Sequence, residues 1–238
     1  MALLGKAAVA MWWHVPPDQR AAFQDWHVHE HFPERLGIPG FRRGSRWAGV
    51  AAPESFFVMY ELATYDVLTS QPYRERLNAP TPWSLQMMPL HRDMVRSQCL
   101  VAESFGGGVA GFVLTIRLSP QPGRGNDLQE ALRSVLSSLP TSAGLTGGHL
   151  LITQTPEAAA TKEQVIRGAD GVADWIVLAF GYDLDALHAV QANELSAHAL
   201  TQAGAGPQQI ATVHRLSFAM TDEDVFPRGH LPIATSAL

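Results

Sequence analysis

The order of predicted strands and helices repeats once along this chain, on either side of the glycine-rich run Phe105-Gly106-Gly107-Gly108. In both halves, short apolar stretches rich in β-branched and aromatic residues alternate with helical patterns. A strand followed by a helix, two strands, a helix and a final strand is the split βαβ arrangement. The sequence therefore predicts an α+β protein with two tandem ferredoxin-like (β-α-β-β-α-β) halves.

The pattern also predicts where each half begins and ends. In the first half we expect strands at 7–15, 41–50, 55–63 and 95–103, and helices at 18–36, 65–77 and 83–91. In the second half we expect strands at 109–118, 148–155, 174–182 and 210–219, helices at 126–139 and 183–203, and a loop at 158–171. The domain boundaries are then 1–105 for a half with the pocket, 106–220 for a degenerate and mainly structural half, and 221–238 for a C-terminal tail.

Each predicted half has a sheet with helices on one face only, so the other face must be covered. A second copy on the same chain can cover it. We therefore expect the two halves to pack sheet to sheet, so that together they approximate a closed barrel.

Composition limits the compartment and the partners. Charged residues are 16% of the chain, below the ~25% of an average soluble domain, which fits large internal interfaces or a homodimer. The net charge of −5 and the lack of a dense Lys/Arg cluster argue against nucleic acid as a partner. No apolar run approaches the ~20 residues of a membrane span. The single cysteine, Cys99, cannot form an internal disulfide, and a cytoplasmic location is the simplest expectation.

Three motifs in the first half resemble a known superfamily. They are Phe23-x-x-Trp26-x-x-x-Glu30-His31, then Ile38-Pro39-Gly40-Phe41 with Arg46-Trp47, and then the run at 57–62. Together they resemble the dimeric α/β-barrel superfamily, in particular the EthD-like and stress-responsive small bacterial proteins, over residues 7–103. In the second half only the element order is similar. The resemblance implies a fold, but the superfamily includes cofactor-free monooxygenases, polyketide cyclases, a lactone isomerase and haem proteins, so it does not imply one reaction.

The candidate acid–base residues lie at one end of the first predicted helix. On an ideal helix, Phe23, Trp26, Glu30 and His31 share a face. A carboxylate beside an imidazole can orient it for proton transfer, so His31 is the predicted acid or base and Glu30 its orienting group. The alternative is a structural pair that fixes the turn after the helix.

Other histidines are weaker candidates. His14, at the end of the first strand, is a second candidate catalytic residue, whereas His91 beside Arg92 has the default interpretation of a surface histidine. His27-x-x-Glu30-His31 has the spacing of an inverted zinc-protease motif. It lacks a third ligand, so no metal is predicted.

Aromatic residues concentrated in the first half suggest a wall for a flat ligand, although core packing is the alternative for most of them. The predicted substrate-binding residues are Trp12, Phe23, Trp26, Trp47, Tyr60 and Trp83. The leading hypothesis is an enzyme without a bound cofactor, acting by histidine acid–base chemistry on a small hydrophobic molecule, aromatic or polyketide-like, as a cyclase, isomerase, lyase or monooxygenase. The alternatives are a non-catalytic ligand-binding or stress-related assembly protein, and a haem-binding protein.

Overall fold

The computed structural model describes residues 3–154, 161–168 and 170–225. Its eight strands form one closed barrel in the order β1-β3-β2-β8-β5-β7-β6-β4, and every neighbouring pair is antiparallel. The strands are β1 (Ala7–His14), β2 (Phe41–Gly49), β3 (Ser55–Leu62), β4 (Arg92–Gly106), β5 (Phe112–Leu118), β6 (Leu145–Thr153), β7 (Trp175–Gly181) and β8 (Ile210–Thr221).

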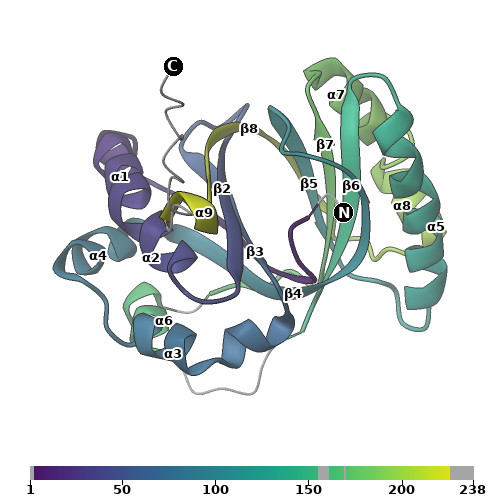
Figure 1. Ribbon diagram of the computed structural model, residues 1–238. Coiled ribbons are helices and arrows are strands. Elements are labelled where there is room, and N and C mark those ends of the chain that lie inside the picture. Colours follow the sequence, from purple (N-terminus) through teal and green to yellow (C-terminus); the bar gives the residue numbers. More distant parts are fainter. Residues whose placement is uncertain (1–2, 155–160, 169, 226–238) are drawn as a thin grey trace, which may run out of the picture.

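Helices lie outside the barrel in two groups on opposite sides (Figure 1). The first group contains α1 (Arg20–Trp26), α2 (Phe32–Leu36), α3 (Gln71–Leu77), α4 (Pro82–Met87), α6 (Lys162–Arg167) and α9 (Asp222–Val225). The second contains α5 (Gly125–Ser138), α7 (Leu184–Ala192) and α8 (Ala197–Ala203). None of the helices in the described part of the chain is long and apolar enough to cross a membrane.

The α+β class and the barrel are confirmed, with one correction to how the halves meet. The four strands of each half do not stack as separate sheets, because β2 pairs with β8 and β4 pairs with β6. Hydrogen bonds along both seams satisfy edges that two stacked sheets would leave open. The tandem ferredoxin-like description and its boundaries stay predictions.

Three predicted elements need correction. The helix expected at 18–36 is α1, then a π-helical turn η2 (His27–His31), then α2. The loop expected at 158–171 contains α6, which lies beside α3 among the helices of the first half (Figure 1). The predicted tail begins later than expected, since β8 continues to Thr221 and α9 follows it. Residues 155–160 and 226–238 lie outside the described residues.

Alternating side chains on each strand divide the core into layers. On β1, Val9, Met11 and Trp13 pack under the helices of the first group, whereas Ala10 and Trp12 face the barrel interior. A separate cluster under α5 and α7 covers the second half. A pocket outside the barrel can therefore form between β1, β3 and the helices of the first group.

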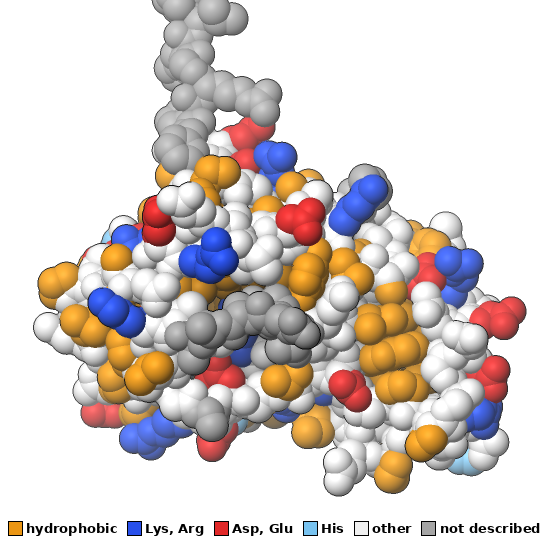
Figure 2. Space-filling view, turned by 90° about the horizontal axis from the view of Figure 1, so that it is seen from below, with side chains coloured by type: hydrophobic (Ala, Val, Ile, Leu, Met, Phe, Trp, Pro, Cys, Tyr) orange, Lys and Arg blue, Asp and Glu red, His pale blue; other side chains and the backbone are white. Residues whose placement is uncertain are grey.

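Several large apolar side chains are exposed on the surface. Figure 2 shows hydrophobic side chains among polar ones on one face, including a larger patch. Exposed apolar residues include Leu4, Leu85, Leu100, Val165 and Val172. The homodimer expected from the composition stays a prediction.

Candidate active site

A pocket lies between the first helix group and the outer faces of β1, β3 and β4. Its apolar lining is Val9, Met11, Trp13, Trp26, Phe41, Leu77, Met88 and Met94. Its polar lining is His27, His31, Arg35, Tyr60, Tyr73, His91, Arg96 and Glu163. The cavity volume is about 40 Å³, enough for a few water molecules. A larger ligand therefore has to displace side chains, and the flexible Met88 and Met94 are suited to that.

The π-helical turn brings two histidines into this pocket. Phe32 N–H donates to the carbonyl of His27, five residues earlier, and Pro33 has no N–H to continue the ordinary ladder. The wider turn stacks the His27 and His31 rings, with centroids 5.3 Å apart and planes 20° apart. Such turns occur frequently at functional sites. The proline inside the predicted helix was the sequence signal for this break.

The same turn directs Glu30 toward α4 instead of into the pocket. Its Oε1 accepts hydrogen bonds from Trp26 Nε1 at 3.1 Å, from Ser84 Oγ at 3.2 Å and from Thr81 Oγ1 at 2.5 Å. Glu30 is not among the lining residues. These contacts favour a structural role for Glu30, joining two helices, over the predicted role of orienting His31.

His91 enters the site from the turn before β4. Its Nδ1 lies 2.8 Å from the carbonyl oxygen of Met88, and its ring is edge-on to Trp13 at 4.7 Å between centroids. A carbonyl oxygen can only accept, so Nδ1 carries the hydrogen and Nε2 is the basic nitrogen of the neutral ring. His91 was interpreted from the sequence as an ordinary surface histidine, yet it lines the pocket.

Donor groups without partners gather around the same pocket. The Tyr60 hydroxyl, the Arg35 Nη1 and the Trp13 Nε1 are buried and make no hydrogen bond with any residue in the described ranges. Burial raises the pKa of Tyr60 far above its ordinary value, so its hydroxyl keeps the proton. Buried polar groups normally have partners, so these three donors are available to bound water or to a ligand that accepts hydrogen bonds.

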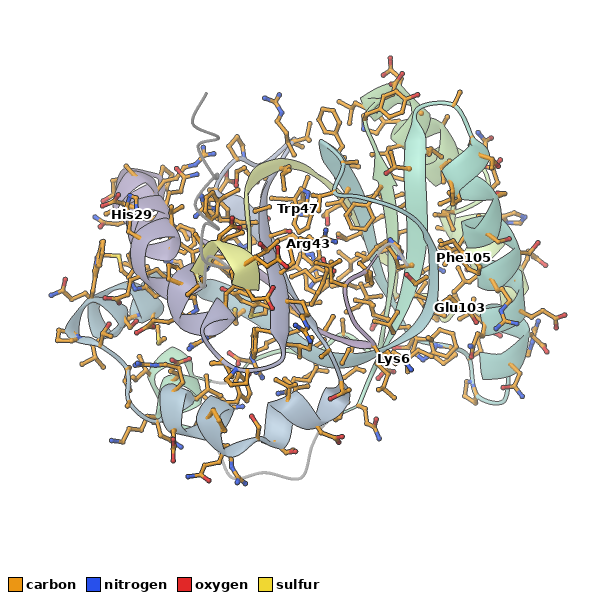
Figure 3. All side chains as sticks on the ribbon, in the orientation of Figure 1. Lys6, His29, Arg43, Trp47, Glu103 and Phe105 are labelled. Atoms are coloured by element: carbon orange, nitrogen blue, oxygen red, sulfur yellow. The ribbon has the colours of Figure 1, made fainter. Side chains whose placement is uncertain are left out.

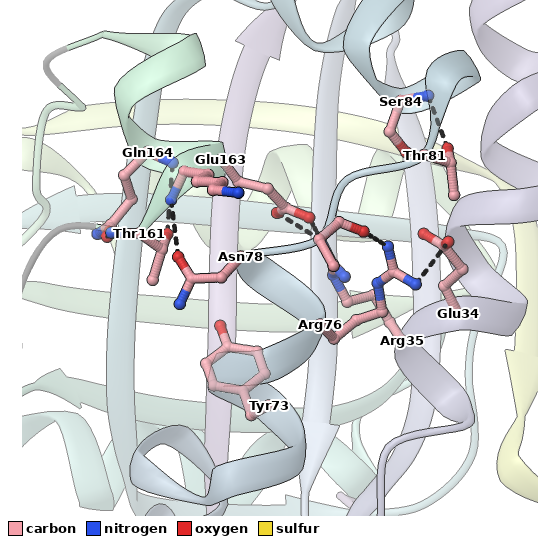
Figure 4. Close-up of polar contacts among 12 residues, drawn as sticks. Glu34, Arg35, Tyr73, Arg76, Asn78, Thr81, Ser84, Thr161, Glu163 and Gln164 are labelled. Carbon is pink, nitrogen blue, oxygen red and sulfur yellow. Dashed lines mark hydrogen bonds and ion pairs between the residues drawn. The ribbon is translucent and has the colours of Figure 1, made fainter.

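Arg35 is held in place by a residue from the second half. Its Nη2 donates to Glu163 Oε1 at 2.6 Å and to Oε2 at 2.5 Å, and both side chains are almost fully buried (Figure 4). Glu163 lies on α6, where Thr161 and Gln164 form a capping box. The second half was predicted to be mainly structural, so its pocket residue Glu163 was not predicted from the sequence.

Glu163→Gln should lower the free energy of unfolding by about 3–5 kcal/mol, because Arg35 would remain as an uncompensated buried charge. Urea denaturation at neutral pH would measure the change. Asp127→Asn is the matched control: it breaks the exposed pair with Arg124, and such pairs contribute about 0–1 kcal/mol. A loss below about 1 kcal/mol for Glu163→Gln would show that the buried pair does not hold α6 in place.

Of the predicted site residues, His31, Trp26 and Tyr60 line the pocket. His14 does not: its side chain is about half exposed at the barrel end, 3.5 Å from Asp93. The period of two on β1 explains this, because Trp13 faces the helices and His14 therefore follows Trp12 toward the other side.

The remaining predicted aromatic residues lie elsewhere. Trp12 and Trp47 fill the barrel interior, where both rings stack on Phe57 with centroids 4.8 and 5.2 Å away. Trp47 is labelled in Figure 3. Phe23 is buried behind the lining, stacked on His27. Trp83 packs partly buried against the same core without reaching the pocket lining. Their contacts favour the core-packing alternative.

The described residues contain no group of three or more His, Cys, Asp or Glu side chains that could hold a metal ion. Cys99 faces the barrel interior, and burial raises its pKa to about 12. A thiol in that state is a poor nucleophile. Cys99 is not among the residues that line the pocket.

No family model matches this sequence, and no curated protein matches it. Solved structures share the fold. A proposed monooxygenase from Fusobacterium nucleatum subsp. nucleatum ATCC 25586 has a TM-score of 0.61 at 8% identity, covering 92% of this chain and 96% of its own. An anthrone oxidase-like protein has a TM-score of 0.60 at 13% identity, covering 91% and 93%. A proposed monooxygenase from Lactobacillus acidophilus NCFM has a TM-score of 0.58 at 8% identity, covering 91% and 97%.

This chain has the same kind of overall fold as these three structures. At identities this low the likeness extends to the fold alone. Any reaction must therefore be argued from the pocket of this chain.

Proposed function

We propose that this protein is an enzyme that removes a proton from a small organic molecule at a position conjugated with a carbonyl or phenolic oxygen, without a tightly bound cofactor. The single observation that carries the proposal is the pairing of one basic imidazole with several unpartnered buried donors in one pocket. His91 supplies the base. Tyr60 and Arg35 supply donors for the oxygen on which charge develops.

The chemistry follows from the two kinds of group. Nε2 of His91 takes a proton from an acidic C–H or O–H of the ligand and becomes an imidazolium. The electron pair left behind delocalises onto the neighbouring oxygen, where the Tyr60 hydroxyl and Arg35 Nη1 can hydrogen-bond to it. Preformed donors in a site without bulk water stabilise such an oxyanion much more than they would in water.

Two outcomes of this common step fit the fold neighbours and the sequence hypothesis. Returning the proton at a different atom gives an isomerase or cyclase. With molecular oxygen as the second substrate, a carbanion at a CH₂ group adds O₂, and the resulting hydroperoxide loses water to give a ketone. The second outcome corresponds to the monooxygenase and anthrone oxidase-like descriptions of the neighbours.

The alternatives have less support. A porphyrin is larger than the small organic molecules proposed here, so haem would have to displace more of the side chains around a cavity of about 40 Å³. A non-catalytic ligand-binding protein would use the same donors but would not need the base. A catalytic assay therefore separates it from the enzyme.

Two carbon acids of different size test the proposal. Acetylacetone, which is small, and anthrone, which is tricyclic, each carry a CH₂ group made acidic by a carbonyl. In D₂O, mass spectrometry would follow exchange of deuterium into that group, and an oxygen electrode would follow O₂ use. Faster exchange of either probe than with buffer alone supports the proposal, and consumption of one O₂ per anthrone, yielding anthraquinone and water, assigns the monooxygenase outcome. Exchange no faster than in buffer alone, with no O₂ use for either probe, would leave the binding protein as the better account. A Soret band in the purified protein would favour haem.

A further inference from the structure

We infer that Arg46 is a positioning residue that holds His27 in the Nε2–H form, so that His27 is a hydrogen-bond donor in the pocket and never its base. The site then selects a ligand that presents an oxygen lone pair. This inference rests on the proposed function for what the donor does to a ligand, but the state of the ring can be measured without any ligand.

The contact between the two side chains determines the ring's hydrogen. Arg46 Nη1 lies 3.3 Å from His27 Nδ1, and both groups are buried. A guanidinium has donors only, so Nδ1 must accept and the hydrogen of the neutral ring must sit on Nε2. His91 has the opposite arrangement, since the Met88 carbonyl requires a hydrogen on its Nδ1. Two neighbouring histidines are therefore fixed in opposite tautomers, one a donor and one a base.

The surroundings keep His27 neutral. Burial, followed by the charge of Arg46 and the neighbouring His91 and Arg35, lowers the pKa of His27 well below its ordinary value. The rings of His31 and Phe23 both stack on that of His27, with centroids 5.3 and 5.1 Å away. The ring can therefore neither rotate freely nor take a proton, which suits a fixed donor.

Arg46 is itself fixed by the seam between the halves. Its Nε donates to Ser217 Oγ at 3.2 Å, and Ser217 Oγ donates to the Arg46 carbonyl at 3.0 Å. The β2–β8 register shifts between Arg46 and Trp47, so Ser217 is an extra residue of β8 at this point. Bulges of this kind redirect side chains next to functional sites.

Two aromatic rings complete the arrangement. The Arg46 guanidinium carbon lies 5.9 Å from the ring centroids of both Phe23 and Phe218. The first belongs to α1 and the second to β8. Phe218 and Ser217 come from the second half. The β2–β8 seam therefore also positions Arg46, the residue that contacts His27 in the pocket outside the barrel.

The test is a long-range ¹H–¹⁵N correlation spectrum of the ¹⁵N-labelled wild-type protein between pH 6 and 8. His27 signals are assigned by their loss in His27→Gln. We expect one pyridine-like nitrogen, Nδ1, and one pyrrole-like nitrogen, Nε2, with no change over this range. A wild-type ring with its hydrogen on Nδ1, or one that titrates in this range, would overturn the inference.

Variants separate positioning from packing. Arg46→Met keeps an apolar stem but removes the donor and the charge, so the two nitrogen shifts should move toward each other as tautomers mix, while burial still keeps the ring neutral. Arg46→Lys restores one donor and the charge and should restore most of the wild-type pattern. Arg42→Met, on the same strand but exposed and paired with Asp222, is the control and should change nothing. An unchanged His27 spectrum in Arg46→Met would overturn the inference. If that variant fails to fold, the wild-type and Arg46→Lys spectra still show whether the hydrogen lies on Nε2. Failure of both carbon-acid probes would leave these spectra unaffected, so the two proposals can fail separately.

Discussion

His91→Gln is expected to lower the rate of deuterium exchange into acetylacetone or anthrone by about 10²–10⁴-fold, the usual contribution of a general base. Glutamine keeps a similar length and a polar end but cannot take a proton at neutral pH. The pocket should therefore keep its shape while losing the group whose Nε2 is basic. Initial exchange rates at saturating probe, measured for wild-type and variant at the same pH, give the comparison.

His31→Gln is the matched variant, because His31 lines the same pocket and was the base predicted from the sequence. Its ring stacks on His27 and lies tilted against Trp26, which is the position of a lining residue, so we expect a loss below about tenfold. If His31→Gln abolishes exchange and His91→Gln does not, the sequence-based assignment is right and the structure-based one is wrong. Unfolding curves of both variants would show whether either loss reflects an unfolded protein.

The elements of this fold could be predicted because their signals are local. Short continuous apolar runs with aromatic residues mark β1 and β3, and glycine and proline lie near their ends. The long first helix was predicted too simply, since Pro33 inside it already indicated a break. The helix α6 was missed because a stretch of polar and small residues carries no apolar period. Its Glu163 becomes meaningful only when Arg35, far away in sequence, lies against it.

The site was harder to predict, for a related reason. Trp26, His31 and Tyr60 were found because a helix face and a strand face put them together. Trp12 and Trp47 were placed with them by residue type, although the period of two sends both into the barrel. Whether an imidazole is a base or a donor depends on one partner atom, such as the Met88 carbonyl, and no sequence pattern carries that information.

Acid should destabilise this protein strongly through two histidines inside the barrel. Burial lowers the pKa of His149 to about 3 and, with Arg117 nearby, lowers that of His214 to about 4. In the unfolded chain both have an ordinary pKa near 6.5. Below pH 6.5 the unfolded state therefore binds protons that the folded state cannot, so stability present above this pH is lost as the pH falls toward the folded values.

The expected loss is about 1.4 kcal/mol per histidine for each pH unit, or about 5 kcal/mol for the pair between pH 7.5 and 4.5. His27, also held neutral by burial, adds in the same direction. Glu61 opposes it, because burial raises the pKa of that carboxyl and the folded protein takes up its proton first. Urea unfolding followed by tryptophan fluorescence at half-unit steps from pH 8 to 4.5 measures the slope.

Two leucine variants test which histidine causes the loss of unfolding free energy at low pH. His214 Nδ1 has no partner among the described residues, so His214→Leu loses no hydrogen bond there and should reduce the loss between pH 7.5 and 4.5 by about 2.5 kcal/mol. His188→Leu, at an exposed position on α7, should leave the slope unchanged because its side chain is hydrated in both states. Equal slopes for wild-type and His214→Leu would mean that the barrel interior accepts a proton at His214, and that acid sensitivity comes from elsewhere.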